Sequence, residues 1–258
     1  SVATVTLTPT TKAYANNTSI TAAEVAVEAV STPKGTVNAR GLAVSPGVSV
    51  GASSASATLS PIVQAWVGGG GRLISADSLA VQAHTELPSS GYNLEAQASG
   101  ASGGLLLGVN GTVTSVVNNA DVRAWVADRS TLNVTDTQII ADNQTRQIAD
   151  AGSLSVGGIA GIGGADSTAE SHTKTWAWIG SNVTLTGTSL TVSALGDDDN
   201  YAQTLAASGG LVGAAGTFSE TSVNASTKAE IGANTTIDLT GGIDGTFVLG
   251  ADHTSTSR

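Results

Sequence analysis

One short pattern recurs along this 258-residue chain and limits what the chain can fold into. Each copy has an alanine that follows a polar or aromatic residue and precedes an aromatic or charged one, as in QAWVGG and KTWAWIG. The five alanines are spaced by 52, 59, 53 and 52 residues, at Ala13, Ala65, Ala124, Ala177 and Ala229. Such regular spacing is typical of repeat proteins in which each unit stacks on the next.

Two more landmarks recur in constant order around each alanine. A run of glycine and apolar residues precedes it, as in SGGLLLGVNG, and a pair of strand-like segments follows it, as in NVTLTGTSLTVSA. These landmarks predict one continuous array with the units 1–34 (partial), 35–92, 93–146, 147–200 and 201–258. Because the array starts and stops out of phase with its unit, we expect a fragment of a longer chain.

The composition favours strands and turns over helices. Glycine accounts for 32 residues, β-branched residues are abundant, and helix-forming Lys, Glu, Leu and Arg are few. We therefore predict an all-β fold, a β-solenoid that resembles a parallel β-helix, built from about five repeats of 52–59 residues. Because a unit of this length is long for one coil, we expect two coils per unit. At about 4.8 Å per coil, roughly ten coils make a rod about 50 Å long.

The strand around each alanine alternates cleanly between two kinds of side chain. Ala177 and Ile179 fall on one face, and Trp176 and Trp178 fall on the other. The small aliphatic face is the natural inward face, so we expect the aromatic residues to face outward. The repeat predicts two outward columns: Tyr14, Trp66, Trp125, Trp178 and Glu230 in one, and Lys12, Gln64, Arg123, Trp176 and Lys228 in the other.

Two interpretations of the aromatic column remain open at this stage. In the first, each ring covers the glycine-apolar run of its own unit, because those runs are apolar on both faces. In the second, the rings form an exposed ladder about 9.6 Å apart, close to the length of a disaccharide, and stack on sugars. The second interpretation predicts a ligand surface made of Tyr14, Trp66, Trp125, Trp176, Trp178, Lys12, Arg123 and Lys174.

One acidic cluster interrupts the repeats, at Asp197, Asp198 and Asp199. Oxygen-rich loops bind Ca²⁺, so the cluster is a candidate calcium site, although a solvated acidic turn explains the same residues. The three histidines lie far apart in sequence, without a second ligand at metal-binding spacing. We therefore expect no cofactor, with calcium as the alternative.

Charge and cysteine content exclude several classes of protein. The net charge is −10 and the ten basic residues are scattered, so we expect no nucleic-acid partner. No cysteine is present, which excludes disulfides, thiolate metal sites and cysteine nucleophiles. No apolar run reaches the roughly 20 residues of a membrane-spanning helix, so we expect no membrane span.

The repeats resemble a known class of bacterial protein. The unit GGLVGAAG followed by VNASTKAEIGANTTI, and its counterpart GGIAGIGG followed by SHTKTWAWIGSNVTL, are similar to the repeat regions of giant secreted exoproteins. These include filamentous-haemagglutinin-like adhesins and leukotoxin-like surface proteins. The resemblance implies an extracellular or cell-surface β-solenoid, exported by a type I or type V route. It carries over no catalytic residue.

These observations predict a structural, non-catalytic stalk or filament segment of a bacterial surface adhesin. The alternative is a carbohydrate-binding module that uses the aromatic column. A third hypothesis is a β-helix enzyme that degrades polysaccharide, which would need two carboxylates facing one another in a groove. The partners we expect are polysaccharides, other surface proteins, or a further copy associated end to end.

Overall fold

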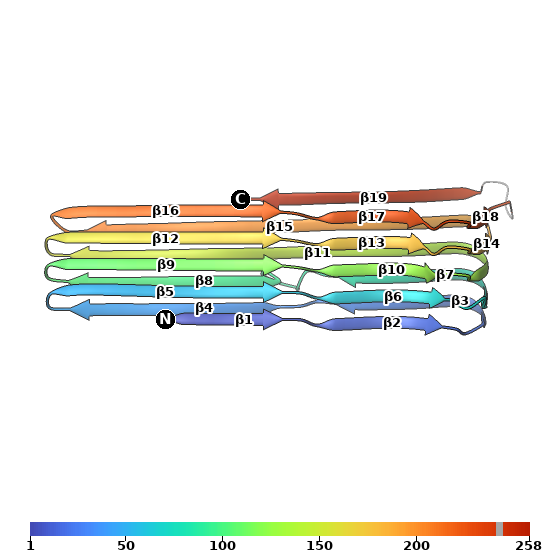
Figure 1. Cartoon of the computed structure of the whole chain (residues 1–258), viewed down its shortest axis with the longest axis horizontal. Coiled ribbons are helices and arrows are strands. Elements are labelled where there is room, and N and C mark those ends of the chain that lie inside the picture. Colours follow the sequence, from blue (N-terminus) through green and yellow to red (C-terminus); the bar gives the residue numbers. More distant parts are fainter. Residues whose placement is uncertain (241–244) are drawn as a thin grey trace.

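The computed structural model describes residues 1–240 and 245–258, and the regular structure of these residues is built from strands alone. The strands form three parallel sheets, which we call A, B and C, and successive coils of the chain stack on one another (Figure 1). Each coil runs along sheet A, then along sheet B, and returns through sheet C. The fold is an all-β solenoid, as the sequence predicts.

Sheet A contains β1 (Val2–Leu7), β5 (Val48–Leu59), β9 (Leu107–Asn118), β12 (Ala160–Ser171) and β16 (Val212–Val223). Sheet B contains β2 (Thr10–Asn16), β6 (Ile62–Gly68), β10 (Asp121–Ala127), β13 (Lys174–Ile179) and β17 (Ser226–Ile231). Sheet C contains β3 (Ile20–Ser31), β4 (Gly35–Ser45), β7 (Leu73–Thr85), β8 (Leu94–Gly104), β11 (Thr131–Gly157), β14 (Thr184–Thr186), β15 (Ser189–Gly209), β18 (Thr236–Asp238) and β19 (Thr246–Ser257).

Each repeat forms one coil, so the prediction of two coils per unit is wrong. Neighbouring strands pair residues one full repeat apart: Ala65 pairs with Ala124, and Ala124 pairs with Ala177. The sheet C strands are longer than expected, and β11 alone spans 27 residues. One elongated coil therefore uses a whole repeat. Five coils at about 4.8 Å each rise only about 24 Å, well short of the predicted length of about 50 Å.

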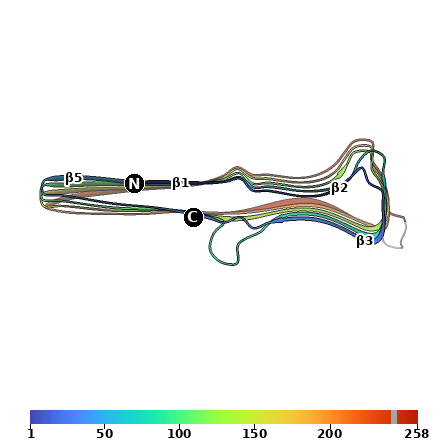
Figure 2. The same cartoon turned by 90° about the horizontal axis from the view of Figure 1, so that it is seen from below.

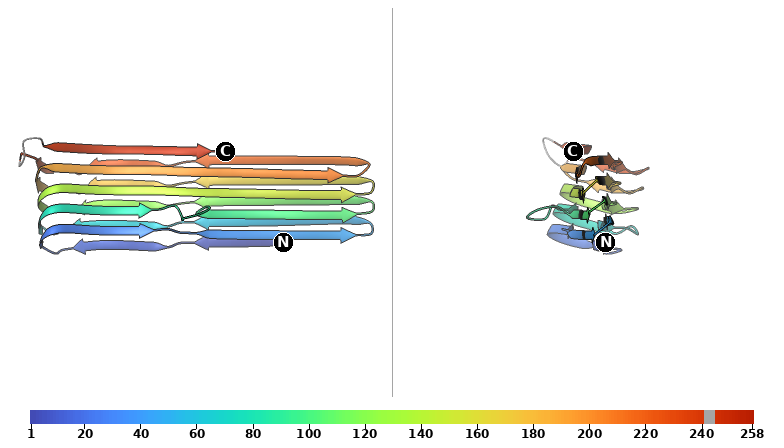
Figure 3. Two further views of the ribbon diagram at one scale, coloured as in Figure 1. Left: turned by 180° about the vertical axis from the view of Figure 1, so that it is seen from behind. Right: turned by 90° about the vertical axis from the view of Figure 1, so that its left-hand side faces the viewer.

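The coil is flattened into two lobes joined at a waist (Figure 2). In the broad lobe, sheet B faces the first part of sheet C. In the narrow lobe, sheet A faces β4, β8 and the later parts of β11 and β15. The waist is where sheet A passes into sheet B, at Asn119–Ala120 and at His172–Thr173. Figure 3 shows that the lobes stack with little shift from coil to coil.

The aliphatic face of the anchor strands is inward, as predicted. Val63, Ala65 and Val67 of β6 are fully buried, and their counterparts in β10 are buried as well. They form the core of the broad lobe together with sheet C residues such as Leu132 and Ile139. A second, smaller core of mainly alanine occupies the narrow lobe next to the waist.

Asparagine and glycine make the turn between sheets B and C. Asn17, Asn182 and Asn234 have φ values of 53°, 58° and 56°, in the left-handed region that asparagine tolerates better than most residues. Arg129 holds the same place in the third coil, with φ of 57°, and a run of four glycines fills it in the second. Several Asn-x-Ser/Thr triplets of the sequence are therefore turn residues.

The longest of the spacings between the repeat alanines, from Ala65 to Ala124, comes mainly from one loop. Opposite β11, His84 of β7 pairs with Asp142, whereas Leu94 of β8 pairs with Gln147. The second coil therefore carries five additional residues between these two pairings. They bulge away from sheet C (Figure 2), and the register on either side is undisturbed.

Glycine allows the two sheets of the narrow lobe to approach closely. A Cβ added to Gly161 of β12 would clash with the carbonyl oxygen of Gly209 and lie 2.9 Å from that of Ser155. By contrast, a Cβ at Gly164 on the same strand would point into open space. On this strand, therefore, the inward Gly161 is sterically required and the outward Gly164 is not.

Candidate functional site

The predicted aromatic column lies on the outer face of sheet B. Tyr14, Trp66, Trp125 and Trp178 occupy equivalent positions on four successive strands. Their ring centroids are 4.3, 4.8 and 4.7 Å apart and their planes are within 8° of parallel, so the four rings form one continuous stack.

The stack overturns both earlier interpretations of the rings. With one coil per repeat, the rings recur at the strand spacing and contact each other, so the prediction that they stand a disaccharide length apart is wrong. They do not cover the glycine runs either, because those runs lie in sheets A and C of the narrow lobe. Both faces of Trp66 and of Trp125 are occupied by neighbouring rings. Among the residues that the structure describes, only the end rings of the stack, Tyr14 and Trp178, have an outer face without a ring against it.

Trp176 belongs to the neighbouring column and lies between two cations. The guanidinium carbon of Arg123 is 5.1 Å from the Trp176 ring centroid and the ammonium of Lys228 is 5.2 Å from it. Arg123 pairs with Gln64 below and with Trp176 above in the register, and Trp176 pairs with Lys228. Cation–π contacts near a protein surface contribute about 0.5–1 kcal/mol each, and the Trp176 ring is half-buried. The indole N–H of Trp176 has no hydrogen-bond partner among the described residues.

A shallow pocket of about 280 Å³ opens where the two columns meet. Its lining combines two indole rings with charges of both signs: Arg123, Trp176, Ala177, Trp178, Lys228 and Glu230. Glu230 follows Trp178 in the aromatic column, and this is the point at which the ring stack ends. The pocket therefore offers a flat apolar surface beside groups that can bind hydroxyls or carboxylates.

The charges around this pocket are partly paired. Arg123 binds Asp121 through two hydrogen bonds of 2.6 Å, and Lys228 lies 3.9 Å from Glu230 in a half-exposed ion pair. Lys174 is exposed at the start of β13, and Lys12 lies at the far end of the column. Four of the ten basic residues of the chain thus gather on one face of a protein with net charge −10.

The predicted acidic cluster does not form a common site. Asp197, Asp198 and Asp199 lie within β15, not in a turn, so their side chains alternate between the two faces of the strand. Asp197 and Asp199 face outward, and Asp198 is fully buried. Residues 1–240 and 245–258 contain no group of three His, Asp or Glu side chains placed to hold a metal ion. The three carboxylates therefore cannot converge on one calcium ion.

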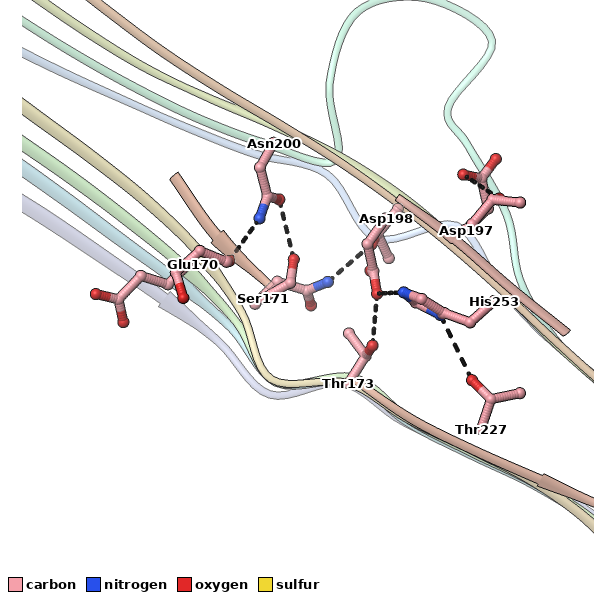
Figure 4. A network of polar contacts seen from close by, with 12 residues as sticks. Glu170, Ser171, Thr173, Asp197, Asp198, Asn200, Thr227 and His253 are labelled. Atoms are coloured by element: carbon pink, nitrogen blue, oxygen red, sulfur yellow. Dashed lines mark hydrogen bonds and ion pairs between the residues drawn. The ribbon is translucent and has the colours of Figure 1, made fainter. Parts of the chain in front are cut away.

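Asp198 instead belongs to a buried polar network at the waist (Figure 4). Its carboxylate accepts hydrogen bonds from the hydroxyls of Thr145 and Thr173 and lies 3.7 Å from Nε2 of His253. Burial raises the pKa of Asp198 above its ordinary value, while the two hydroxyls and His253 act in the opposite direction.

Asn200 and Gln147 complete the network. The Gln147 side chain donates to Oδ1 of Asn200 at 2.8 Å, and Asn200 donates to the carbonyl oxygen of Ser222. Sequence analysis missed this network, although a signal was present. The alternation that places Val192 and Ala194 inward continues through Asp198 and Asn200, and so predicts polar groups inside the solenoid.

No family model matches the sequence, and no curated protein or solved structure is significantly similar to it. Within the described ranges, no helix is long and apolar enough to cross a membrane.

Proposed function

We propose that the chain is a structural, non-catalytic segment of an extracellular bacterial surface protein, in which stacked coils act as a stiff spacer. One observation carries this proposal: like residues stack on like residues, in the inward alanine column through all five coils and in the outward aromatic stack through four of them. A stack of this kind adds length without changing its cross-section, which suits a stalk or filament. The bacterial and extracellular parts rest on the resemblance to exoprotein repeats.

Contacts between coils support a load-bearing role. Arg146 contacts Asp199 of the next coil at 3.2 Å, and Ser189 donates to Asp136 of the preceding coil at 2.7 Å. The waist network links consecutive coils from within. The ring stack links four of them from outside. Adjacent coils are therefore joined on both sides of each sheet as well as through the backbone ladder.

Single-molecule pulling tests the spacer role. The two termini lie at opposite ends of the stack (Figure 1), so handles attached to them load the coils in series. We expect discrete unfolding events with contour-length increments of about 180 Å, or multiples of it, because one coil of about 53 residues extends to roughly that length. Smooth extension at negligible force would contradict a spacer that stays folded under load.

A second candidate function is carbohydrate binding, and the pocket beside Trp178 is the observation that favours it. A sugar ring stacked on the outer indole face would bring its hydroxyls or a carboxylate within reach of Lys228 and Arg123. The stack changes the earlier hypothesis, because only an end of the column, and not its length, can contact a sugar face to face.

Titration against a panel of neutral and acidic polysaccharides tests this second function. Trp178→Ala should abolish binding, since it removes the platform that lines the pocket. Trp66→Ala is the matched control, because it removes a ring whose two faces are covered by Tyr14 and Trp125. Equal loss in both variants, or no binding by the unmodified chain, would contradict a sugar site at this pocket.

A further inference from the structure

The outer half of the narrow lobe contains no charged side chain. We call this region the wedge; it comprises the register-matched residues 41–53, 100–112, 153–165 and 206–217, and it is bounded by Arg40 on the sheet C face and by Asp166 on the sheet A face. The whole chain has ten basic and twenty acidic residues, yet none falls in these four segments. The segments lie one above another in successive coils, so the uncharged region runs along the stack.

The outer surface of the wedge is apolar on both faces and at its tip. In the internal coils Leu154 is 48% exposed and Val156 is 49% exposed on the sheet C face, and at the tip Leu105 is 69% exposed. The sheet A face carries the exposed Ile162 in the same way. In contrast, the outward positions of sheet C in the broad lobe include several polar or charged side chains: Glu24, Glu28, Gln82, Gln138 and Asp142.

The inside of the wedge is small and polar. Ser102 and Ser155 contact each other at 3.2 Å between their hydroxyl oxygens, and the amide of Asn110 donates to the hydroxyl of Ser153 at 2.8 Å. Inward glycines such as Gly161 allow the two sheets to meet. The wedge is therefore held together by internal hydrogen bonds and close backbone packing, and its exposed leucines and valines contribute no core. The wedge thus has a polar interior and an apolar surface, whereas the interior of the broad lobe is apolar.

We propose that the wedge inserts into one leaflet of a lipid bilayer. A second copy of the chain would cover one face and leave the other face and the tip in water, whereas lipid covers all three. Charged groups are strongly disfavoured in hydrocarbon, and the wedge has none. The backbone groups of its internal coils are already paired with neighbouring coils, as an apolar medium requires.

The size of the wedge and the residues at its base fit the same medium. Each strand contributes about six residues to the wedge, or roughly 20 Å, which is comparable to the depth of one hydrocarbon leaflet, about 15 Å. At the base, Tyr92 and Tyr201 pack edge to face, with ring centroids 6.0 Å apart, and the Arg258 guanidinium lies 5.9 Å from the Tyr201 ring. Tyrosine and arginine are residues that favour the boundary between lipid and water.

Site-specific labelling tests the insertion. Because the chain has no cysteine, a Leu106→Cys substitution at the tip carries the only reactive thiol. With an environment-sensitive dye on this thiol and phosphatidylcholine vesicles that carry brominated acyl chains, we expect a blue shift and quenching. The same dye on the Ser19→Cys variant, in a turn at the opposite end of the coil, should show neither.

Paired charge substitutions test which surface is responsible. Leu105→Asp with Leu211→Asp should weaken flotation with neutral vesicles by at least about tenfold, because each buries a carboxylate in lipid. Ile62→Asp with Leu73→Asp adds the same charge at exposed aliphatic positions of the broad lobe and should leave flotation unchanged. Circular dichroism of the Trp stack reports whether each variant is folded.

Three results would overturn the proposal. The first is no flotation of the unmodified chain with vesicles. The second is equal loss of flotation in the two paired variants. The third is a dye response of the labelled Leu106→Cys variant that needs no lipid and follows the formation of dimers in sedimentation, since it would show that a second copy covers the wedge.

Discussion

Nε2 of His253, on the last strand of the solenoid, lies 3.7 Å from the carboxylate of Asp198 in the coil below. Both side chains point inward at the waist, where Nδ1 of His253 lies 3.4 Å from the hydroxyl of Thr227. A buried carboxylate in contact with two threonine hydroxyls and a histidine joins three strands at the point where the two hydrophobic cores separate. The position of this pair makes the stability of the final coil sensitive to the ionisation of one group.

The free energy of unfolding should therefore decrease as the pH rises, over a range set by the pKa of Asp198. Burial raises its pKa above the ordinary value of 3.8, so the folded protein retains a proton that the unfolded chain has already released. The free energy of unfolding should fall as pH rises from about 3.8 through the raised pKa and then level off. Urea denaturation at a series of pH values, compared with Asp198→Asn, isolates this contribution. Parallel curves for the two proteins would contradict it.

The ring stack should stabilise the fold most at its centre. Trp125→Ala removes a ring that contacts Trp66 and Trp178, and we expect a loss of about 2–4 kcal/mol in the free energy of unfolding. Tyr14→Ala removes an end ring that is 60% exposed and stacks on one neighbour, so its cost should be about 0.5–1.5 kcal/mol. Chemical denaturation followed by circular dichroism measures the free energy of unfolding of both variants. Equal losses would contradict the prediction that the central ring stabilises the fold more than the end ring.

Two glycines of the same strand should respond in opposite ways to an added methyl group. Gly161→Ala forces a Cβ against the carbonyl oxygens of the facing sheet, and we expect destabilisation of about 1–3 kcal/mol. Gly164→Ala points into open space and should be neutral, or stabilising by up to about 1 kcal/mol, because it restricts the unfolded chain. Thermal unfolding of the two variants distinguishes them, and similar melting temperatures would show that the sheets can separate.

Removing one whole repeat should leave a folded protein. Deletion of residues 125–177 joins Ala124 to Trp178 and keeps every inward and outward position, because Ala124 and Ala177 are register partners. Deletion of residues 125–176 is one residue shorter and joins Ala124 to Ala177, which turns Ile179 outward. We expect cooperative unfolding for the first protein, and partial unfolding or aggregation for the second. Comparable far-ultraviolet spectra and melting curves for both would contradict the register.

The sequence predicts those parts of the fold that depend on local alternation and on the repeat itself. The inward column through Ala65 and Ala124 and the outward column through Trp66 and Trp125 follow directly from the period of two along a strand. The number of coils does not follow, because alternation gives no sign of how far β11 runs before the chain turns. The landmark interpreted as two strands forms two strands in the fourth coil, β14 and β15, whereas in the third coil it lies within the single strand β11.

The site was predicted less well, because its geometry depends on the distance between coils. Tyr14 and Trp66 lie one whole repeat apart in sequence, and only the coil count decides whether their rings touch. The Asp197–Asp199 cluster was interpreted by composition, as a turn rich in oxygen ligands, when its alternation already separated Asp198 from its neighbours. The sequence also gives no clear sign that the wedge is polar inside and apolar outside, because glycine, which belongs to neither class, interrupts the alternation of serine and valine there.

The loop between Thr85 and Leu94 shows how the architecture can acquire new parts. Its five additional residues do not disturb the strand pairing on either side, where His84 pairs with Asp142 and Leu94 pairs with Gln147. The Asn93 side chain donates to the carbonyl oxygen of Pro33 and accepts from the backbone N–H of Arg146. Insertions at this point of the circumference therefore do not propagate into neighbouring repeats. Evolution or design can therefore insert residues into the surface loop of a single coil here, and the neighbouring coils keep their strand register.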